Sequence, residues 1–558
     1  MPHIQSSDPY DVCIVGSGAG GGMAAYVLAN AGANVLLLEA GPEWHAGEDG
    51  DMFTWNYASP RRGAGTQDRP FGEFDACIGG WAIDGEPYTT AEGTDWDWFR
   101  ARMLGGRTNH WGRISLRFGP DDFKAASRDG LGDDWPIRYD EVKPYYDRVD
   151  RLIGIFGSQE GYYNEPDGVF MPPPAPRCYE KLIQQGAEAM DIPVMPSRMS
   201  IITEDLNDRQ ACHYCGQCNR GCSTHSNFSS GPVLIDPALQ TGNLTLRTNA
   251  MVRRVTTDAE GRATGVSFID TQTRTEQKVQ ADVVVLAASA CESARLLLNS
   301  TSPQHPNGLA NSSDVVGKYL MDSTGTSVAG FFPQLMNQPA HNCDGVGGMH
   351  IYIPWWGYDE HDRLGFPRGY HFETWGGRGM PGYGFGGGIE GLNGRFEGFA
   401  SEKSGGYGTQ LKEDYRRYYG AIVGLSGRGE MVAREDNYCE IDPSTVDQYG
   451  IPVLRFNVNW SDAELQQVRH MQTTAREIIE SAGGTPLGSM PDEEDGYGIL
   501  APGRIIHEVG VTRMGTDPRS SVVNAFGQAH DVDNLFVADG GPFVSMPHKN
   551  PTWTILAL

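Results

Sequence analysis

A glycine-rich turn between an apolar strand and a helix constrains the fold of this chain more than any other feature. Residues 10–15 are a short apolar run, typical of a buried parallel strand. The following residues place Gly16, Gly18 and Gly21 in the pattern G-x-G-x-x-G, and a helical pattern comes next. In this setting the first glycine permits a tight turn, the second admits a pyrophosphate, and the third lets helix and strand pack closely. The sequence therefore predicts a dinucleotide-binding unit.

The end of the second predicted strand indicates what kind of nucleotide binds. This strand, over residues 34–38, ends at Glu39, which lies 18 residues beyond Gly21. A carboxylate at this place can accept hydrogen bonds from ribose hydroxyls, and it would repel the 2′-phosphate of NADP. The motif alone does not separate NAD from FAD, so that choice depends on the rest of the chain.

Three further segments carry a family resemblance. Residues 104–112 read LGGRTNHWG, residues 281–298 read ADVVVLAASACESARLLL, and the C-terminal part holds HEVGVTRMG at 507–515, NLFVADG at 534–540 and NPT at 550–552. With the glycine motif, they resemble the glucose–methanol–choline (GMC) oxidoreductases. The sugar-oxidising branch is the most similar part of that family, and the bacterial glucoside 3-dehydrogenases are the most similar group in it. The resemblance implies an FAD enzyme that removes a hydride from a CH–OH group.

The resemblance also implies a fold. We expect an α/β protein in which a Rossmann-type FAD-binding domain is interleaved with an α+β substrate domain built on an antiparallel sheet. The predicted FAD-binding domain comprises residues 1–125, 210–320 and 500–558, and the substrate-binding domain comprises 126–209 and 321–499. Helical spacing predicts a packed helix over 464–482, and residues 421–425 favour a strand.

Oxidation of a secondary alcohol requires a base for the hydroxyl proton, and histidine suits that task because its pKa lies near working pH. By resemblance, His507 is the base and Asn550 its partner, which orients the substrate oxygen. His548 is two residues from Asn550, and we expect it to line the substrate pocket rather than act in catalysis. Asn550 can also cap a final helix that has Pro551 at its first position.

The resemblance implies further contacts to FAD. In pyranose oxidases a histidine in a Thr-His-Trp setting is linked to the flavin. In this chain Asn109 precedes His110, so non-covalent contact is the expectation. The helix start at Pro551 is expected to face the pyrimidine ring of the flavin. The expected flavin contacts are Gly106, Asn109, His110, Asp539, Gly540, Pro551 and Thr552.

Four cysteines lie within eleven residues, in the pattern C-x2-C-x2-C-x3-C, at Cys212, Cys215, Cys218 and Cys222. This spacing matches the bacterial iron–sulfur run, in which the fourth cysteine can serve a second cluster. The prediction is a [3Fe-4S] or [4Fe-4S] centre, which related sugar dehydrogenases also carry. Disulfides, a zinc site aided by His213 or His225, and unmodified thiols are the alternatives. A cluster offers electrons a one-electron exit and so favours a dehydrogenase over an oxidase; a non-catalytic flavin redox sensor is a further alternative.

The balance of charge restricts the partners. The chain has 44 Lys and Arg against 71 Asp and Glu, a formal net charge of −27. Such a surface repels phosphate backbones, so we expect no nucleic acid partner and an uncharged sugar or glucoside as substrate. No apolar run reaches the ~20 residues of a membrane span. The first residues lack a signal peptide, which predicts a cytoplasmic protein, or a periplasmic one if it is exported with a signal-bearing partner.

The electron acceptor is expected to be a protein, or a quinone or haem subunit. A small companion subunit is implied by the resemblance alone. Four aromatic side chains between residues 355 and 375 could stack on a sugar face, although core packing is expected for most of them: Trp355, Trp356, Tyr370 and Trp375.

Overall fold

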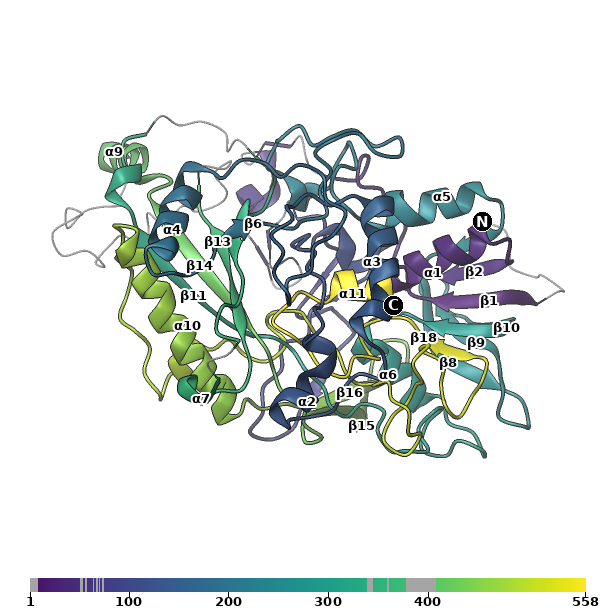
Figure 1. Ribbon diagram of the computed structural model, residues 1–558. Coiled ribbons are helices and arrows are strands. Elements are labelled where there is room, and N and C mark those ends of the chain that lie inside the picture. Colours follow the sequence, from purple (N-terminus) through teal and green to yellow (C-terminus); the bar gives the residue numbers. More distant parts are fainter. Residues whose placement is uncertain are drawn as a thin grey trace.

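A computed structural model describes residues 9–50, 75–338, 345–358, 361–377 and 408–558, together with positions 54–55, 58–63, 65–66, 69 and 71–72. The first residues, on which the expectation about a signal peptide rests, lie outside this range. Two sheets organise the molecule, and they lie at its opposite ends in Figure 1, with α11 (Thr552–Ala557) between them.

The first sheet contains the predicted nucleotide-binding unit. Its parallel part has the order β7-β2-β1-β10-β18. The bounds are Tyr10–Val15 for β1, Val35–Leu38 for β2, Leu244–Arg247 for β7, Glu276–Leu286 for β10 and Leu535–Val537 for β18. Helix α1 (Ala19–Asn30) follows β1 directly. The strands β1 and β2 are almost wholly buried, as expected for a parallel sheet covered on both faces.

Strand β10 belongs to two kinds of sheet. Residues 276–280 pair antiparallel with β9 (Ala263–Asp270), which in turn pairs with β8 (Ala250–Thr257). Residues 281–286 pair parallel with β1 on one side and, near their end, with β18 on the other. The sequence changes accordingly: EQKVQ is polar except for the buried Val279, whereas ADVVVL is mostly apolar. One continuous strand therefore joins a half-exposed meander to the buried core.

The second sheet is antiparallel, with strand order β17-β11-β14-β13-β12-β6. Its strands are Met195–Pro196 (β6), Thr324–Phe331 (β11), Ile351–Ile353 (β12), Tyr370–Trp375 (β13), Ile422–Gly429 (β14) and Thr485–Pro486 (β17). Helix α10 (Asp462–Ser481) packs on β11 and β14, and α4 (Cys178–Glu188) packs on α10. The fold class predicted from the sequence is confirmed, as are the helix near 464–482 and the strand that contains 422–425.

Two segments within the range predicted for the substrate-binding domain pack beside the first sheet and its helices instead. Helix α3 (Tyr139–Ile153) lies against α11, because its apolar residues recur at helical spacing and enter the core of the first sheet. Strands β15 (Tyr438–Val446) and β16 (Pro452–Asn457) form a small sheet with β4 (Thr89–Thr90) and contact α6 (Ala290–Asn299). Further elements are β3 (Gly79–Gly80), β5 (Arg100–Ala101), α2 (Ala125–Asp129), α5 (Asp236–Gln240), α7 (His361–Leu364) and α9 (Gly408–Tyr418).

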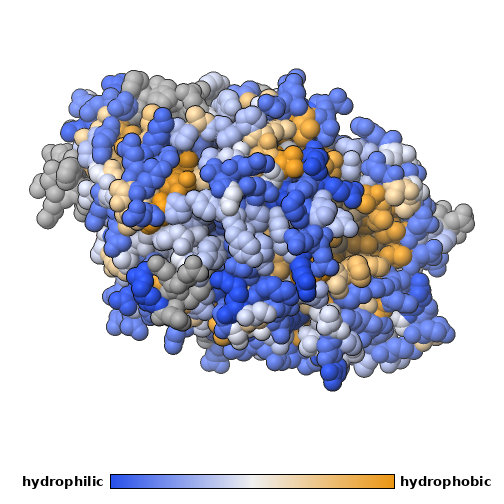
Figure 2. Space-filling model, viewed as in Figure 1, coloured by the Kyte–Doolittle hydropathy of each residue, from blue (hydrophilic) through white to orange (hydrophobic). Residues whose placement is uncertain are grey.

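Hydrophilic residues cover most of the face seen in Figure 2, with apolar side chains gathered in separate patches. None of the helices in the described part of the chain is both long enough and apolar enough to cross a bilayer.

Candidate active site

One cavity of about 720 Å³ extends from the glycine turn of the first sheet to β13 of the second. Its volume falls in the range of ~300–1,000 Å³ that is usual for small-molecule and cofactor sites. Most of the predicted site residues line it: Gly16, Gly18, Glu39, Gly106, His110, Asp539, Gly540, Pro551, Thr552, His507 and Asn550.

The three glycines of the turn have different surroundings. Gly16 has φ 98°, and a Cβ there would lie 2.4 Å from the carbonyl oxygen of Ala287. A Cβ on Gly21 would lie 1.8 Å from the carbonyl oxygen of Gly16, so this glycine allows α1 to approach the end of β1. A Cβ on Gly18, in contrast, would meet nothing within 4 Å. Gly18 therefore leaves open the space before the N-terminus of α1, where phosphates are favoured.

Glu39 connects this turn to two neighbouring segments. Its Oε2 accepts a hydrogen bond from Ser17 Oγ at 2.5 Å, and its Oε1 accepts one from the backbone N–H of Gly41 at 2.8 Å. Ser17 Oγ also accepts a hydrogen bond from the N–H of Gly105 at 2.9 Å. Burial raises the pKa of Glu39. A carboxylate offers about four lone-pair sites, so Glu39 retains acceptor capacity for a ribose.

The segment 104–112 forms a tight turn against the nucleotide loop. Gly105 and Gly106 have φ of 86° and 54°, and a Cβ on Gly106 would lie 3.4 Å from the Cα of Gly18. The structure places Asn109 differently from the predicted flavin contact. Its side chain is buried outside the cavity, and its Nδ2 donates a hydrogen bond to the carbonyl oxygen of Leu104 at 2.8 Å. Asn109 thus fixes the turn, which no sequence pattern indicated.

His110 lines the cavity between aromatic rings. Its ring centroid lies 5.5 Å from that of Phe71 and 4.9 Å from that of Phe99, and its Nδ1 lies 3.8 Å from Oδ1 of Asp75. Burial, with the nearby cations Arg107 and Arg113, lowers the pKa of His110 to about 3. The ring is therefore neutral at neutral pH, and within the described residues its Nε2 has no hydrogen-bond partner.

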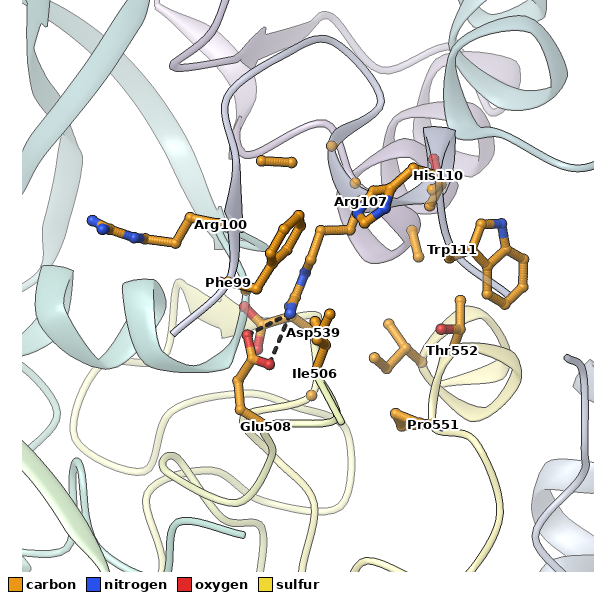
Figure 3. A pocket seen from close by; sticks show the side chains of 18 of the residues that line it. Phe99, Arg100, Arg107, His110, Trp111, Ile506, Glu508, Asp539, Pro551 and Thr552 are labelled. Atoms are coloured by element: carbon orange, nitrogen blue, oxygen red, sulfur yellow. Dashed lines mark hydrogen bonds and ion pairs between the residues drawn. The ribbon is translucent and has the colours of Figure 1, made fainter. Parts of the chain in front are cut away.

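The C-terminal segment provides the opposite wall. Asp539 accepts hydrogen bonds from Ser293 Oγ at 2.5 Å and from the N–H of Gly541 at 2.8 Å, and burial raises its pKa to about 6. Figure 3 shows Pro551 and Thr552 together at the start of α11, facing the cavity.

An ion pair that the sequence did not predict connects the two walls. Arg107 Nη1 lies 2.7 Å from the carboxylate of Glu508, and Figure 3 shows the guanidinium reaching from the segment 104–112 to the loop that follows His507.

His507 and Asn550 come together as predicted, although 43 residues separate them. His507 Nε2 lies 3.3 Å from Asn550 Nδ2, and His507 Nδ1 lies 2.9 Å from Ser323 Oγ. Burial lowers the pKa of His507 to about 3, so its imidazole is neutral at neutral pH. With Nδ1–H donating to Ser323, Nε2 is unprotonated and faces the amide N–H of Asn550. The backbone N–H groups of Ile505 and His507 donate hydrogen bonds to the carboxylate of Asp322, which fixes this loop.

Asn550 does not cap the final helix. Pro551 occupies the cap position, and the N–H of Ile555 donates to the carbonyl oxygen of Pro551 at 3.0 Å. The Asn550 amide points instead to His507 and Glu373, because the helix begins one residue later than expected.

Glu373 on β13 is a site residue that sequence reasoning missed. Its Oε1 lies 3.5 Å from Asn550 Nδ2 and 3.5 Å from His371 Nε2, and its Oε2 lies 3.3 Å from Arg428 Nη2 on β14. Burial alone would raise its pKa, but Arg428, His371 and His507 together outweigh burial and lower the pKa to about 2. An available signal was the spacing of His371 and Glu373, because side chains two apart on a strand share a face.

His548 lies outside the cavity, in contrast to the expected pocket lining. It is fully buried, and its Nε2 lies 3.2 Å from the hydroxyl of Tyr358. Neighbouring Lys549 is fully buried too, with Nζ 2.6 Å from Oδ2 of Asp122 and 3.6 Å from Oε1 of Glu165. This polar cluster immediately precedes Asn550 in the chain and lies outside the cavity.

The cysteine run adjoins the cavity wall. Cys218 and Cys222 are buried, Cys212 and Cys215 are half-buried, and the nine cysteines in the described part of the chain are free. Asn219 lines the cavity, and its side-chain oxygen accepts a hydrogen bond from Arg113 at 2.8 Å.

The four sulfur atoms are not arranged for a single ion. In the described part of the chain, one cluster brings three ligand atoms within 4.8 Å of one another, and it consists of Asp75, Cys77 and His110 instead. A single zinc ion forms Zn–S bonds of ~2.3 Å, so its sulfur ligands must lie close together. The cysteine sulfurs of an iron–sulfur cluster lie farther apart, because several iron atoms stand between them.

Of the four aromatic residues singled out in the sequence, one lines the cavity. Trp375 at the end of β13 is 39% exposed and lies in the cavity wall. The other three, Trp355, Trp356 and Tyr370, pack in or against the core beneath the second sheet.

Comparison with known proteins identifies the family. The N-terminal family model of the GMC oxidoreductases matches residues 82–324, the C-terminal one matches 433–558, and a model of NAD(P)-binding Rossmann-like domains matches 14–63. The chain is a GMC oxidoreductase.

Relatives of this GMC oxidoreductase extend over its whole length. It is 30% identical to 2-methyl-1,2-propanediol dehydrogenase of Mycolicibacterium austroafricanum, over 99% of this chain and 94% of the relative. It is 25% identical to the fructose dehydrogenase large subunit of Gluconobacter japonicus, over 98% and 96%. Among solved structures, the pyridoxine 4-oxidase of Mesorbium loti shares the fold, with a TM-score of 0.63 at 18% identity and coverage of 98% and 97%.

FAD is the cofactor of this GMC enzyme, and its substrates are alcohols or sugars. The residues present fit FAD. The open space at Gly18, the carboxylate of Glu39 at the end of β2 and the absence of a side chain at Gly106 form a cradle for the nucleotide. The same cavity continues to His507 and Asn550.

Proposed function

We propose that this GMC oxidoreductase is a sugar or glucoside dehydrogenase that oxidises a secondary alcohol, at C3 of a glucoside, and passes the electrons on through an iron–sulfur cluster. The observation that carries the proposal is the position of Asn219. It belongs to the cysteine run, yet it lines the same cavity as His507 and Asn550.

The catalytic pair supports removal of a hydroxyl proton. When bound, FAD supplies the acceptor for the hydride that leaves the alcohol carbon. His507 Nε2 accepts the hydroxyl proton, because burial keeps the imidazole neutral and Ser323 holds Nδ1. Asn550 Nδ2 donates a hydrogen bond to the same substrate oxygen and so orients it. The negative charge of Glu373 stabilises the imidazolium that forms.

The substrate end of the cavity supports a sugar. Trp375 offers an aromatic face at the cavity wall, and sugar rings pack on such faces through their C–H groups. Glu373 is a hydrogen-bond acceptor beside the reacting pair, and its charge is already balanced by Arg428. Both features suit an uncharged polyhydroxy compound.

The cysteine run supports a one-electron exit. Cys212, Cys215, Cys218 and Cys222 would hold a [3Fe-4S] or [4Fe-4S] cluster, and such a cluster would supply single-electron transfer. The acceptor would be a protein, or a quinone- or haem-bearing subunit, and a small companion subunit belongs to the same proposal. Cys212 and Cys215 are only half-buried, so this part of the run is in reach of a partner at the surface.

The test is a visible spectrum of anaerobically purified enzyme, with iron, sulfide and zinc analysis, before and after methyl glucoside is added. Flavin bands that bleach over a broad iron–sulfur absorbance support the proposal. Bleaching without iron, with hydrogen peroxide formed in air, would establish a pyranose or glycoside oxidase instead. A flavin that no sugar bleaches would overturn the sugar assignment and favour the redox sensor.

A further inference from the structure

Glu373 is a buried carboxylate in the cavity wall whose charge acts on His507 through space, while its hydrogen-bonding capacity is used neither by that role nor by cofactor binding. We propose that Glu373 is the acceptor of a hydroxyl-binding subsite, so that the preferred substrate is a vicinal diol, with a second hydroxyl on the carbon next to the one oxidised. This inference rests on the proposed function, because it takes the reacting oxygen to lie at His507 and Asn550.

The first argument is that the carboxylate lacks close partners. Its contacts to Asn550, His371 and Arg428 are 3.5, 3.5 and 3.3 Å. Protein N–H···O hydrogen bonds are usually ~2.7–3.2 Å, and an ionised carboxylate can accept about four. Buried polar groups are normally satisfied. Glu373 lines the cavity, so an occupant of the cavity can supply the remaining donors.

The second argument concerns the chemistry of the occupant. An ionised carboxylate only accepts hydrogen bonds, so its partner must be a donor. On a sugar or a related small alcohol, that donor is a hydroxyl or, in an amino sugar, an ammonium group. Arg428 already places a positive charge beside Oε2, and a second cation in the same low-dielectric space would be repelled by it. A neutral hydroxyl gains the charge-assisted hydrogen bond without that repulsion.

The third argument is distance. The reacting oxygen is held by His507 Nε2 and Asn550 Nδ2, and Glu373 Oε1 lies 3.5 Å from that same Nδ2. The two oxygens of a vicinal diol are about one hydrogen-bond length apart, so the second one falls beside the carboxylate.

The fold keeps this spacing constant. His371 Nδ1 donates a hydrogen bond of 2.5 Å to the carbonyl oxygen of His548, two residues before Asn550. Strand β13, which carries Glu373, is thereby tied to the loop that carries the reacting amide.

The test compares three rings of equal size: trans-1,2-cyclohexanediol, cyclohexanol and trans-2-aminocyclohexanol. Flavin reduction by each is followed anaerobically at pH 7.5 in the complete enzyme, with methyl glucoside alongside. A charge-assisted hydrogen bond contributes ~1.5–3 kcal/mol, so the wild type should prefer the diol to cyclohexanol by about 10- to 150-fold in kcat/KM.

Two variants locate that preference. Glu373→Gln should reduce the diol-to-cyclohexanol ratio by about 10-fold or more, while Glu373→Asp, which keeps the charge, should retain part of it. Both are checked for flavin content and melting temperature. Glu430→Gln is the matched control, because Glu430 is also paired with an arginine, Arg368, at the end of β14 but lies outside the cavity. Its ratio should equal that of the wild type.

Each other outcome decides against the subsite. Equal use of diol and cyclohexanol by the wild type, or an unchanged ratio in Glu373→Gln, overturns it and leaves alcohol oxidation intact. Preference for the amino alcohol would show an ammonium site instead. If neither the rings nor methyl glucoside bleach the flavin, the proposed function itself fails, and the subsite with it.

Discussion

Two alanine substitutions in the glycine turn should separate cofactor binding from folding. A methyl group on Gly21 would sit 1.8 Å from the carbonyl oxygen of Gly16, where ordinary contact begins at 3.4 Å. The obstacle is backbone, so β1 and α1 must move apart by more than 1 Å. Overpacking usually costs ~1–3 kcal/mol, and we expect Gly21→Ala at the upper end or beyond.

Gly18→Ala should behave in the opposite way. Gly18 has φ −66°, outside the left-handed region that favours glycine, and its added methyl meets no protein atom within 4 Å. The folded protein should lose nothing, and it could gain the ~0.4–1 kcal/mol that a restricted unfolded chain provides. The methyl does, however, enter the space of the diphosphate. Loss of one backbone hydrogen bond to a charged group costs ~1.5–3 kcal/mol, which raises the Kd of FAD about 10- to 150-fold.

The assay is flavin content after gel filtration, an FAD titration by flavin fluorescence, and thermal unfolding of each variant. Gly18→Ala should lose FAD affinity at an unchanged melting temperature of the flavin-free form, and Gly21→Ala should lower that temperature. Wild-type affinity in Gly18→Ala would mean that the phosphates do not approach this turn. A wild-type melting temperature in Gly21→Ala would refute the packing argument.

Three further predictions concern the catalytic and buried groups. His507 must be neutral to accept a proton and has a pKa of about 3, so kcat/KM should stay level from pH 8 to 5 and fall only towards pH 3. An inflection of the pH profile near 6.5 would contradict this. His507→Ala should lower kcat/KM by about 10²-fold or more with FAD still bound. Lys549→Met leaves two buried carboxylates unpaired and should cost ~3–5 kcal/mol in unfolding experiments, against ~1 or less for Lys318→Met at a more exposed pair. In stopped-flow measurements, Cys215→Ala should leave the rate of flavin reduction by sugar unchanged but slow flavin reoxidation by the acceptor. Wild-type rates of the variant in both half-reactions would exclude an electron path through the cysteine run.

The nucleotide end was accessible to sequence reasoning because its constraints are local. The turn of Gly16, Gly18 and Gly21 lies within a few residues of its own strand and helix, so spacing alone predicts the geometry. The pairing of His507 with Asn550 required the family resemblance, because nothing local brings the two together. The antiparallel sheet was likewise expected from the resemblance.

The substrate end could not be predicted, since it depends on strand register. Glu373 acquires its role because β13 pairs with β14, where Phe372 lies opposite Gly427 and His371 opposite Arg428. A shift by one residue would turn Glu373 to the other face of the sheet. The prediction that His548 lines the pocket was wrong for a related reason. The neighbouring Lys549 is buried in ion pairs with Asp122 and Glu165, which come from distant parts of the sequence.

The dual pairing of β10 has a consequence during synthesis. Strand β10 ends at Leu286, and its outer partner β18 begins at Leu535, so roughly 250 residues are translated between them. At ~5–20 residues per second, the apolar half of β10 waits about 12–50 s with an unpaired edge. An open apolar edge is a template for pairing with another chain. The edge is covered in the folded enzyme, but each nascent chain exposes it until β18 has been synthesised. Lower growth temperature and chaperone supply are therefore the first variables to adjust for soluble yield.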